Sequence, residues 1–170
     1  MAGYGDRPFG LRQVKLTDEA GANAVTLPRA LMMHVTPRME VTEFTAEAVV
    51  VGASVFAAGA DWELEAGGLS LEAWAKLTGL SAAAAGSTPN RTWTMTAAAG
   101  AEFPYLRVYG RAVGDAGSDD VYCVMYRCKL TSIEGSFRRG DFYITSCAGV
   151  AVSNATGLYQ FVQRETGAAL

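Results

Sequence analysis

The sequence predicts a mainly β protein of two packed antiparallel sheets, sandwich- or barrel-like, with one short flanking helix at about residues 70–79. Three observations lead to this fold class. Segments of alternating apolar and polar residues recur along the chain, Gly- and Asp-rich turns separate them, and only one segment has helical periodicity. With 170 residues, half of them apolar, the chain can build one domain with a substantial core.

Residues 1–10 are expected to form a loose N-terminal arm, because they combine Gly, Pro and scattered aromatic residues. Residues 11–17 alternate weakly, as in a strand, and the turn-rich residues 18–23 end it. The first strand is therefore expected close to the start of the domain.

The clearest strand pattern lies at residues 31–45, where apolar and polar side chains alternate. This period predicts an antiparallel strand with one dry face and one wet face. Pro37 cannot donate a hydrogen bond to a neighbouring strand, so we expect a bulge, a break or a sheet edge there. The apolar row, expected in the core or at an interface, includes Met33, Val35, Met39 and Val41, and the polar row consists of His34, Thr36, Arg38, Glu40 and Thr42.

Two further segments extend the β pattern toward the helix. Residues 48–57 are apolar at nearly every position, as in a strand that is covered on both faces. Residues 61–66 alternate again, with Trp62, Leu64 and Ala66 on the apolar side. The acidic side of this strand carries Asp61, Glu63 and Glu65.

Residues 70–79 carry the signals of a short amphipathic helix. Ser70 provides an N-cap oxygen, and Gly79 suits the left-handed position after the helix. A helix of this length is marginal alone and must pack on a sheet. We expect Glu72 and Lys76 on its outer side and, on the packing side, Leu71, Trp74 and Leu77.

After the helix, residues 81–90 are expected to be a flexible connection, and strands dominate the rest of the chain. Residues 158–165 fit either a last strand or a docked tail, within a C-terminal tail of about 158–170. One domain then covers residues 1–170. The remaining predicted strands, separated by turns, span residues 92–98, 105–113, 121–133 and 142–152.

Charged residues make up only 18% of the chain, and the net charge is −3. This balance disfavours a nucleic-acid-binding protein, which needs clustered Lys and Arg to neutralise phosphates. The low charged fraction favours a protein whose surface is partly covered by partners. Arg138 and Arg139, on a predicted turn, either contact such a partner or lie in solvent.

The sequence contains no pattern typical of an enzyme, a cofactor site or a metal site. His34 is the single histidine, and no second ligand stands near it at metal-binding spacing. Three cysteines without paired spacing predict free buried thiols. The apolar run at 48–60 is too short and Gly-rich to cross a membrane. We therefore predict a non-enzymatic protein, without cofactor or membrane segment, that binds something or assembles.

The order of elements resembles that of the tail tube, or major tail, proteins of bacteriophages with long non-contractile tails. The strand–Gly-Gly–helix junction, and a Tyr-x-Cys-Lys-Leu-type strand before a Gly-Asp strand, are the most characteristic parts. The similarity covers most of the chain and depends on order and length. Its stretches are GLRQVKLTDEAG (10–21), LMMHVTPRMEVTEF (31–44), WELEAGGLSLEAWAKLTGL (62–80), YLRVYGRAVGD (105–115) and YCVMYRCKLTSIEGSFRRGDFYITS (122–146).

The resemblance implies copies that form hexameric rings, stacked as a hollow tube in the virion tail and assembled in the cytoplasm of the host bacterium. Implied partners are the tape measure protein in the lumen and the tail terminator and baseplate or tip proteins. Double-stranded DNA would pass through without specific binding. By position, residues 33–57 would form the long hairpin that reaches neighbouring subunits. A tube protein of a contractile tail or of a type VI secretion system is a related alternative.

A DNA conduit is expected to have an acidic or neutral polar lumen, which repels phosphates within a Debye length of about 8 Å. The polar rows of residues 31–45 and 61–66 are both candidates, and the sequence does not choose between them. The other class of function is a monomeric β-sandwich binding module, for instance for carbohydrate, which would show an exposed aromatic platform. The three tryptophans instead occupy apolar-facing positions, at Trp62, Trp74 and Trp93.

Overall fold

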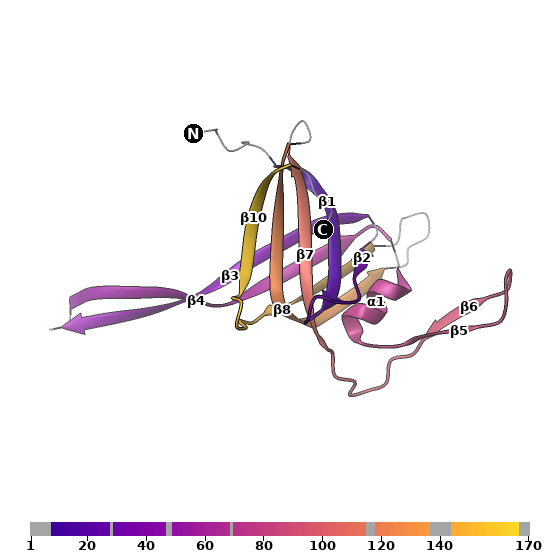
Figure 1. The fold of residues 1–170 in the computed structure, drawn as a ribbon. Coiled ribbons are helices and arrows are strands. Elements are labelled where there is room, and N and C mark those ends of the chain that lie inside the picture. The colour runs from indigo at the N-terminus through magenta and orange to yellow at the C-terminus, as the bar shows by residue number, and fades with distance from the viewer. Residues whose placement is uncertain are drawn as a thin grey trace.

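The computed structural model describes residues 8–27, 29–46, 49–68, 70–114, 118–136 and 144–166. This part of the chain forms ten strands and one helix (Figure 1). The elements are β1 (Pro8–Asp18), β2 (Val25–Leu27), β3 (Ala30–Ala46), β4 (Val49–Ala66), α1 (Leu71–Thr78), β5 (Ala82–Ala85), β6 (Thr92–Met95), β7 (Tyr105–Gly114), β8 (Ser118–Ser136), β9 (Ile144–Ala151) and β10 (Tyr159–Thr166).

Eight strands form one antiparallel sheet in the order β2-β1-β7-β8-β9-β4-β3, with β10 paired to β8 beside this path. The prediction of a mainly β, antiparallel protein with one short helix is confirmed. The two packed layers are parts of one continuous sheet that is not closed. They share β8, whose residues 118–125 pair with β10 and whose residues 128–136 pair with β9.

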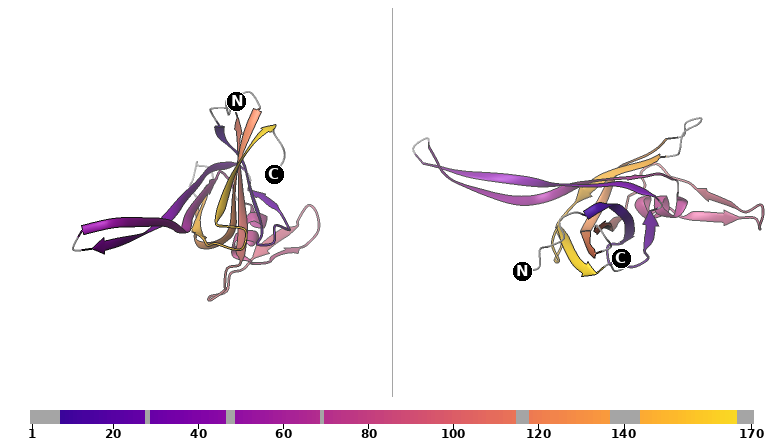
Figure 2. Two further views of the ribbon diagram at one scale, coloured as in Figure 1. Left: turned by 60° about the vertical axis from the view of Figure 1, so that its left-hand side comes forward. Right: turned by 90° about the horizontal axis from the view of Figure 1, so that it is seen from above.

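The first layer contains β10, β8, β7 and β1, and the second contains β9, β4 and β3. Figures 1 and 2 show the second layer crossing behind the first. The pairing of β7 with β8 shifts register between Leu106 and Val108, close to where β8 passes from one layer to the other. Such a bulge bends and twists a strand, which lets the long β8 serve both layers.

The core lies between the layers and is built from their inward positions. Trp62 and Leu64 of β4 are each only 1% exposed and belong to the same buried cluster as Val14 of β1. The Met33 side chain reaches from the second layer to the first. Its sulfur lies against Gly110 of β7, where any Cβ would collide with it. Gly110 therefore permits the close approach of the two layers.

Helix α1 has the predicted ends. Ser70 is the N-cap and accepts a hydrogen bond from the Ala73 amide at 3.2 Å, and Gly79 follows the helix with a left-handed φ of 73°. The buried residues are Ala73, Leu77 and Thr78, whereas Leu71 and Trp74 are half-buried. The packed side is thus turned away from the expected Leu71–Trp74–Leu77 stripe. The small Ala73 side chain lets the helix approach the ends of β2, β4 and β9 closely.

The outer position predicted for Lys76 is wrong. Its side chain is only 14% exposed and forms an ion pair with Asp18 at the end of β1. Helix α1 leans on β1 and β2, which brings the long Lys76 stem along apolar surface toward Asp18. Hydrogen bonds from Lys76 and then from Asn23 hold the pKa of the Asp18 carboxyl below its usual value.

Asp18→Asn will lower the free energy of unfolding at pH 7 by about 0.5–1 kcal/mol, since it removes a partly exposed ion pair. A lowered carboxyl pKa stabilises the folded state fully above the unfolded pKa of about 3.9, and this contribution is lost as pH falls through the folded value. Urea denaturation of both proteins should show the difference shrinking below about pH 4. Glu72→Gln on the same helix is the control, because Glu72 is exposed and has no ion pair within the described residues.

Several boundaries differ from the sequence prediction. The expected connection at 81–90 contains β5, which pairs with β6 to form a second projecting hairpin (Figure 1). The predicted strand at 92–98 ends at Met95. Of the expected N-terminal arm, residues 8–10 begin β1, while residues 1–7 lie outside the described residues. Residues 159–166 form β10, so the strand alternative holds for this part of the C-terminal tail.

Candidate functional site

A two-stranded ribbon projects far beyond the two-layered body (Figures 1 and 2). We call residues 39–46 of β3 and 49–58 of β4 the arm. β4 pairs with β9 only from Ala60 to Ala66, so β9 does not support the arm, yet β3 and β4 remain paired out to Ala46 and Val49. A two-stranded ribbon without a packing layer is marginal in water, so the arm lacks the cover that its length requires.

The arm exposes large apolar side chains on both of its faces. Residues 52–58 are exposed, although the sequence predicts cover on both sides of this strand. Val41 lies opposite Val55 on one face, and Phe56 lies opposite Glu40 on the other face. Exposed apolar surface gathered on a projecting segment is typical of an interaction site. The exposed fractions are Met39 57%, Val41 58%, Phe44 70%, Val55 60% and Phe56 49%.

A bulge marks the base of the arm. One extra residue, Ala58, is inserted in β4 opposite the step from Arg38 to Met39. Pro37 directly precedes this step, on a strand at the end of the sheet path. The bulge and the edge position expected at Pro37 are therefore both found. An ion pair between Arg38 and Asp61 joins the two strands just inside the body.

The two predicted polar rows lie side by side on one outer surface of the body. His34 pairs with Glu63, and Thr36 pairs with Asp61. The residues between them, such as Trp62, point into the core, so these polar side chains point outward. Glu65 is the next residue of β4 on this surface. Glu65 of β4 and Glu134 of β8 both pair with Ser146 of β9, so Glu134 lies on the same surface. We call Glu63, Glu65 and Glu134 the acidic face. The last two residues of the polar row, Glu40 and Thr42, lie on the arm.

The predicted apolar row divides at the base of the arm. Met33 and Val35 are half-buried against the core, whereas Met39 and Val41 are exposed on the arm. Met33 and Val35 also line an apolar groove of about 230 Å³, together with Leu11, Cys123 and Phe161. The other two candidates for an interface, Arg138 and Arg139, lie outside the described residues.

Sequence reasoning missed a second charged surface, on the outer side of the first layer. Along YLRVYGR in β7, side chains alternate, so Tyr105, Arg107, Tyr109 and Arg111 share one side, while Leu106 and Val108 are buried on the other. That alternation of Tyr and Arg is the signal that could have found it. We call this surface the cation–tyrosine face, and its members are Lys15, Tyr105, Arg107, Tyr109, Arg111, Tyr122, Tyr126, Arg127, Lys129 and Arg164.

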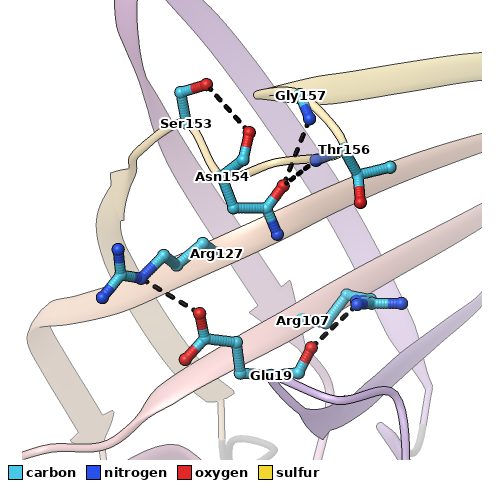
Figure 3. Close-up of polar contacts among 7 residues, drawn as sticks. All are labelled: Glu19, Arg107, Arg127, Ser153, Asn154, Thr156 and Gly157. Carbon is cyan, nitrogen blue, oxygen red and sulfur yellow. Dashed lines mark hydrogen bonds and ion pairs between the residues drawn. The ribbon is translucent and has the colours of Figure 1, made fainter.

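The cationic side chains of this face lie over the tyrosine rings. Arg127 lies 4.2 Å from the centre of the Tyr105 ring, and five further cation–ring distances are between 5.1 and 5.9 Å. Glu19 holds two of the cations, as Figure 3 shows: its Oε1 lies 3.1 Å from Arg127 Nε, and its backbone oxygen accepts from Arg107 at 2.8 Å. The rings and the carboxylate together fix the positions of these long side chains.

Three carboxylates offset part of the charge of the cation–tyrosine face. Glu19 pairs with Arg127, Glu102 pairs with Lys129 at 2.9 Å, and the buried Asp120 pairs with Arg111 at 2.5 Å. Six cations and three carboxylates leave a net charge of +3 on this surface. The acidic face on the other layer has the opposite sign, so the body is charged asymmetrically.

The described residues contain no group of three or more His, Cys, Asp or Glu placed to hold a metal ion. Their three thiols are free, and burial raises the pKa of Cys123 to about 11 and of Cys128 and Cys147 to about 12. Protonated thiols are poor nucleophiles, so none of them is activated at neutral pH. The helix that the structure describes is too short to cross a bilayer.

The tryptophans differ widely in exposure. Trp62 is buried, Trp74 is half-buried, and Trp93 of β6 is 55% exposed. Trp93 borders an open cleft of about 550 Å³ together with Leu71 and Ala75 of the helix. Trp93 is thus the most exposed of the three tryptophans, and the exposed phenylalanines among the described residues are Phe44, Phe56 and Phe161.

Comparisons with known proteins assign the chain to no family. No protein-family model matches the sequence, and no curated protein is detectably similar to it. The argument about function therefore depends on the arm and on the two charged faces.

Proposed function

We propose that this protein is the structural subunit of a bacteriophage tail tube, which assembles with further copies of itself into stacked hexameric rings that conduct the genome. The observation that carries the proposal is the arm, whose large apolar side chains have no cover in the single chain. Burying one such side chain contributes about 1.5–3 kcal/mol, so several of them can drive association. The resemblance to tail tube proteins, with their long hairpin at residues 33–57, supports the same assignment.

In this proposal the acidic face lines the lumen. Glu63, Glu65 and Glu134 form no ion pair among the described residues, so their charge is free to act on a passing ligand. A lumen of one sign repels phosphates and lets DNA pass without specific binding. The two polar rows need not be alternatives, because they share one surface.

The remaining partners follow from the resemblance: the tape measure protein in the lumen, and the tail terminator and baseplate or tip proteins at the tube ends. The place of action is the virion tail, assembled in the host cytoplasm. A tube of a contractile tail or a type VI secretion system would use the same kind of subunit and stays the alternative.

The purified full-length chain is expected to form rings or tubes. Light scattering after size-exclusion chromatography and negative-stain microscopy, over a concentration series, will report the size and shape of the particles. A chain that stays monomeric at every concentration, also with a crowding agent present, would contradict the proposal. Binding of the monomer to a glycan array, lost in Trp93→Ala, would favour the carbohydrate-binding module instead.

A further inference from the structure

We propose that the cation–tyrosine face of one copy is the docking surface for the arm of a second copy. The inference rests on the proposed function, because it takes the arm to bind another copy of this chain. It adds where on the neighbour the arm binds and which chemistry selects that site.

The arm carries charge of one sign only. Residues 39–46 and 49–58 contain Glu40 and Glu43 and no Asp, Lys or Arg, which gives the arm a net charge of −2. Glu40 and Glu43 are exposed, and neither has an ion pair in the described part of the chain. An apolar and acidic ribbon is best matched by a surface that offers rings and cations together.

The cation–tyrosine face offers this combination. Its net charge of +3 is opposite in sign to that of the arm. The half-exposed rings of Tyr105 and Tyr109 supply apolar area, whereas Tyr122 and Tyr126 are buried. Tyr and Arg are the residues enriched at protein interfaces. Six cation–ring contacts among the described residues hold these side chains in place, so the surface loses little entropy on binding.

Other surfaces suit the arm less well. The acidic face repels the arm. The apolar groove at Met33 and Val35 is lined by no Lys or Arg that could pair with the glutamates of the arm. A nucleic acid is the other polyanion that could bind the cation–tyrosine face. Half of the cations there are already paired with carboxylates, whereas phosphate binding draws its affinity from every Lys or Arg that releases counterions.

The placement of the two surfaces determines the kind of assembly. The arm extends from the second layer (Figure 2). The cation–tyrosine face lies on the side of the first layer opposite to the buried Leu106 and Val108. One copy therefore uses its arm and the next copy uses its face, which is a head-to-tail contact. Head-to-tail contacts close into rings or continue as filaments.

Charge reversal tests the pairing of arm and face. The arm variant is Glu40→Lys with Glu43→Lys, and the face variant is Lys15→Glu with Arg164→Glu, two cations without an ion pair among the described residues. Each variant alone is expected to need at least about tenfold more protein for assembly, because like charges then meet. An equimolar mixture should assemble within about threefold of the wild-type concentration, since each arm finds a complementary face on the other variant.

Two checks separate this effect from unfolding or from loss of surface charge. Arg29→Glu with Arg91→Glu changes the net charge equally at exposed positions elsewhere and should assemble as the wild type does. Thermal unfolding of each variant reports its fold. Lys15→Gln with Arg164→Gln replaces the face variant if charge reversal unfolds it, and should weaken assembly by a smaller factor.

The outcomes are distinct for the two proposals. Restored assembly in the mixture supports the docking of arm on face. If the wild type assembles but the face variant assembles equally well, or the mixture shows no recovery, the inference is overturned while the proposed function stands. A wild type that never assembles overturns both. Binding of labelled double-stranded DNA that is lost in the face variant, with assembly unchanged, overturns the inference in favour of a polyanion site.

Discussion

Serine in place of both Phe44 and Phe56 will raise the concentration needed for assembly about a hundredfold or more, without destabilising the monomer. The two rings are 70% and 49% exposed and lie on the same face of the arm. Burial of a Phe side chain is worth about 1.5–3 kcal/mol, and about 1.4 kcal/mol corresponds to a factor of ten in affinity. Since water already surrounds both rings in the single chain, the folded monomer loses little when they are removed.

Sedimentation velocity over a concentration series, with thermal unfolding beside it, will check this result. Leu31→Ser is the matched control, because Leu31 is 57% exposed on β3 but lies in the body. It should change neither the unfolding temperature nor assembly. Tubes formed by the double serine variant at the wild-type concentration would show that this face of the arm takes no part in assembly.

The alternation at residues 31–45 was enough to predict the strand and its two faces, since side chains on a strand alternate whatever lies beside it. It was not enough to predict where the body ends. The pattern continues unchanged through Met39 and Val41, yet their burial depends on β9, which pairs with β4 only as far as Ala60. That limit is set by a strand about a hundred residues away and leaves no local trace.

The wrong prediction that residues 48–57 are covered on both faces is itself informative. Its sequence is apolar on both sides, as in a covered strand, whereas residues 52–58 are exposed in the single chain. A segment composed for burial but exposed in the monomer is the pattern expected of a surface that a partner covers. The apolar composition of this segment therefore fits the buried environment that we propose for it in the assembled tube.

The packed side of helix α1 and the cation–tyrosine face were missed for different reasons. The ends of the helix follow from local capping chemistry, but its packed side depends on the corner between β2, β4 and β9, which favours the small Ala73 over Trp74. In β7, Tyr and Arg alternate with buried residues, but composition gave no reason to expect six cation–ring contacts in a chain of net charge −3. Net charge does not describe how charge is distributed over two layers.

Alanine at each of the three tryptophans will destabilise the protein in the order of their burial, with Trp62→Ala losing about 3–5 kcal/mol. Trp62 is 1% exposed, and its indole covers Gly149 of β9 so closely that a Cβ there would collide with it. Whole domains are stable by only about 5–15 kcal/mol, so this loss is a large part of the total. Urea denaturation followed by circular dichroism measures it.

Trp74 and Trp93 are internal controls for that experiment, since they undergo the same change at other depths. Trp74 is half-buried, and its Nε1 donates to Thr145 at 3.4 Å, so Trp74→Ala should cost about 1–2 kcal/mol. Trp93 is 55% exposed, and Trp93→Ala should cost less than about 0.5 kcal/mol. A Trp93 effect as large as that of Trp62 would contradict the assignment of the core to the space between the two layers.

Trp62→Phe will cost less than half as much as Trp62→Ala. The Trp62 Nε1 is buried and has no hydrogen-bond partner in the described part of the chain, and an unpaired buried donor costs about 1–3 kcal/mol. Phenylalanine removes this donor while retaining an aromatic ring between the layers, so the gain offsets part of the lost packing. If Trp62→Phe is as harmful as Trp62→Ala, the fit of the whole indole against Gly149 outweighs the cost of its unpaired N–H.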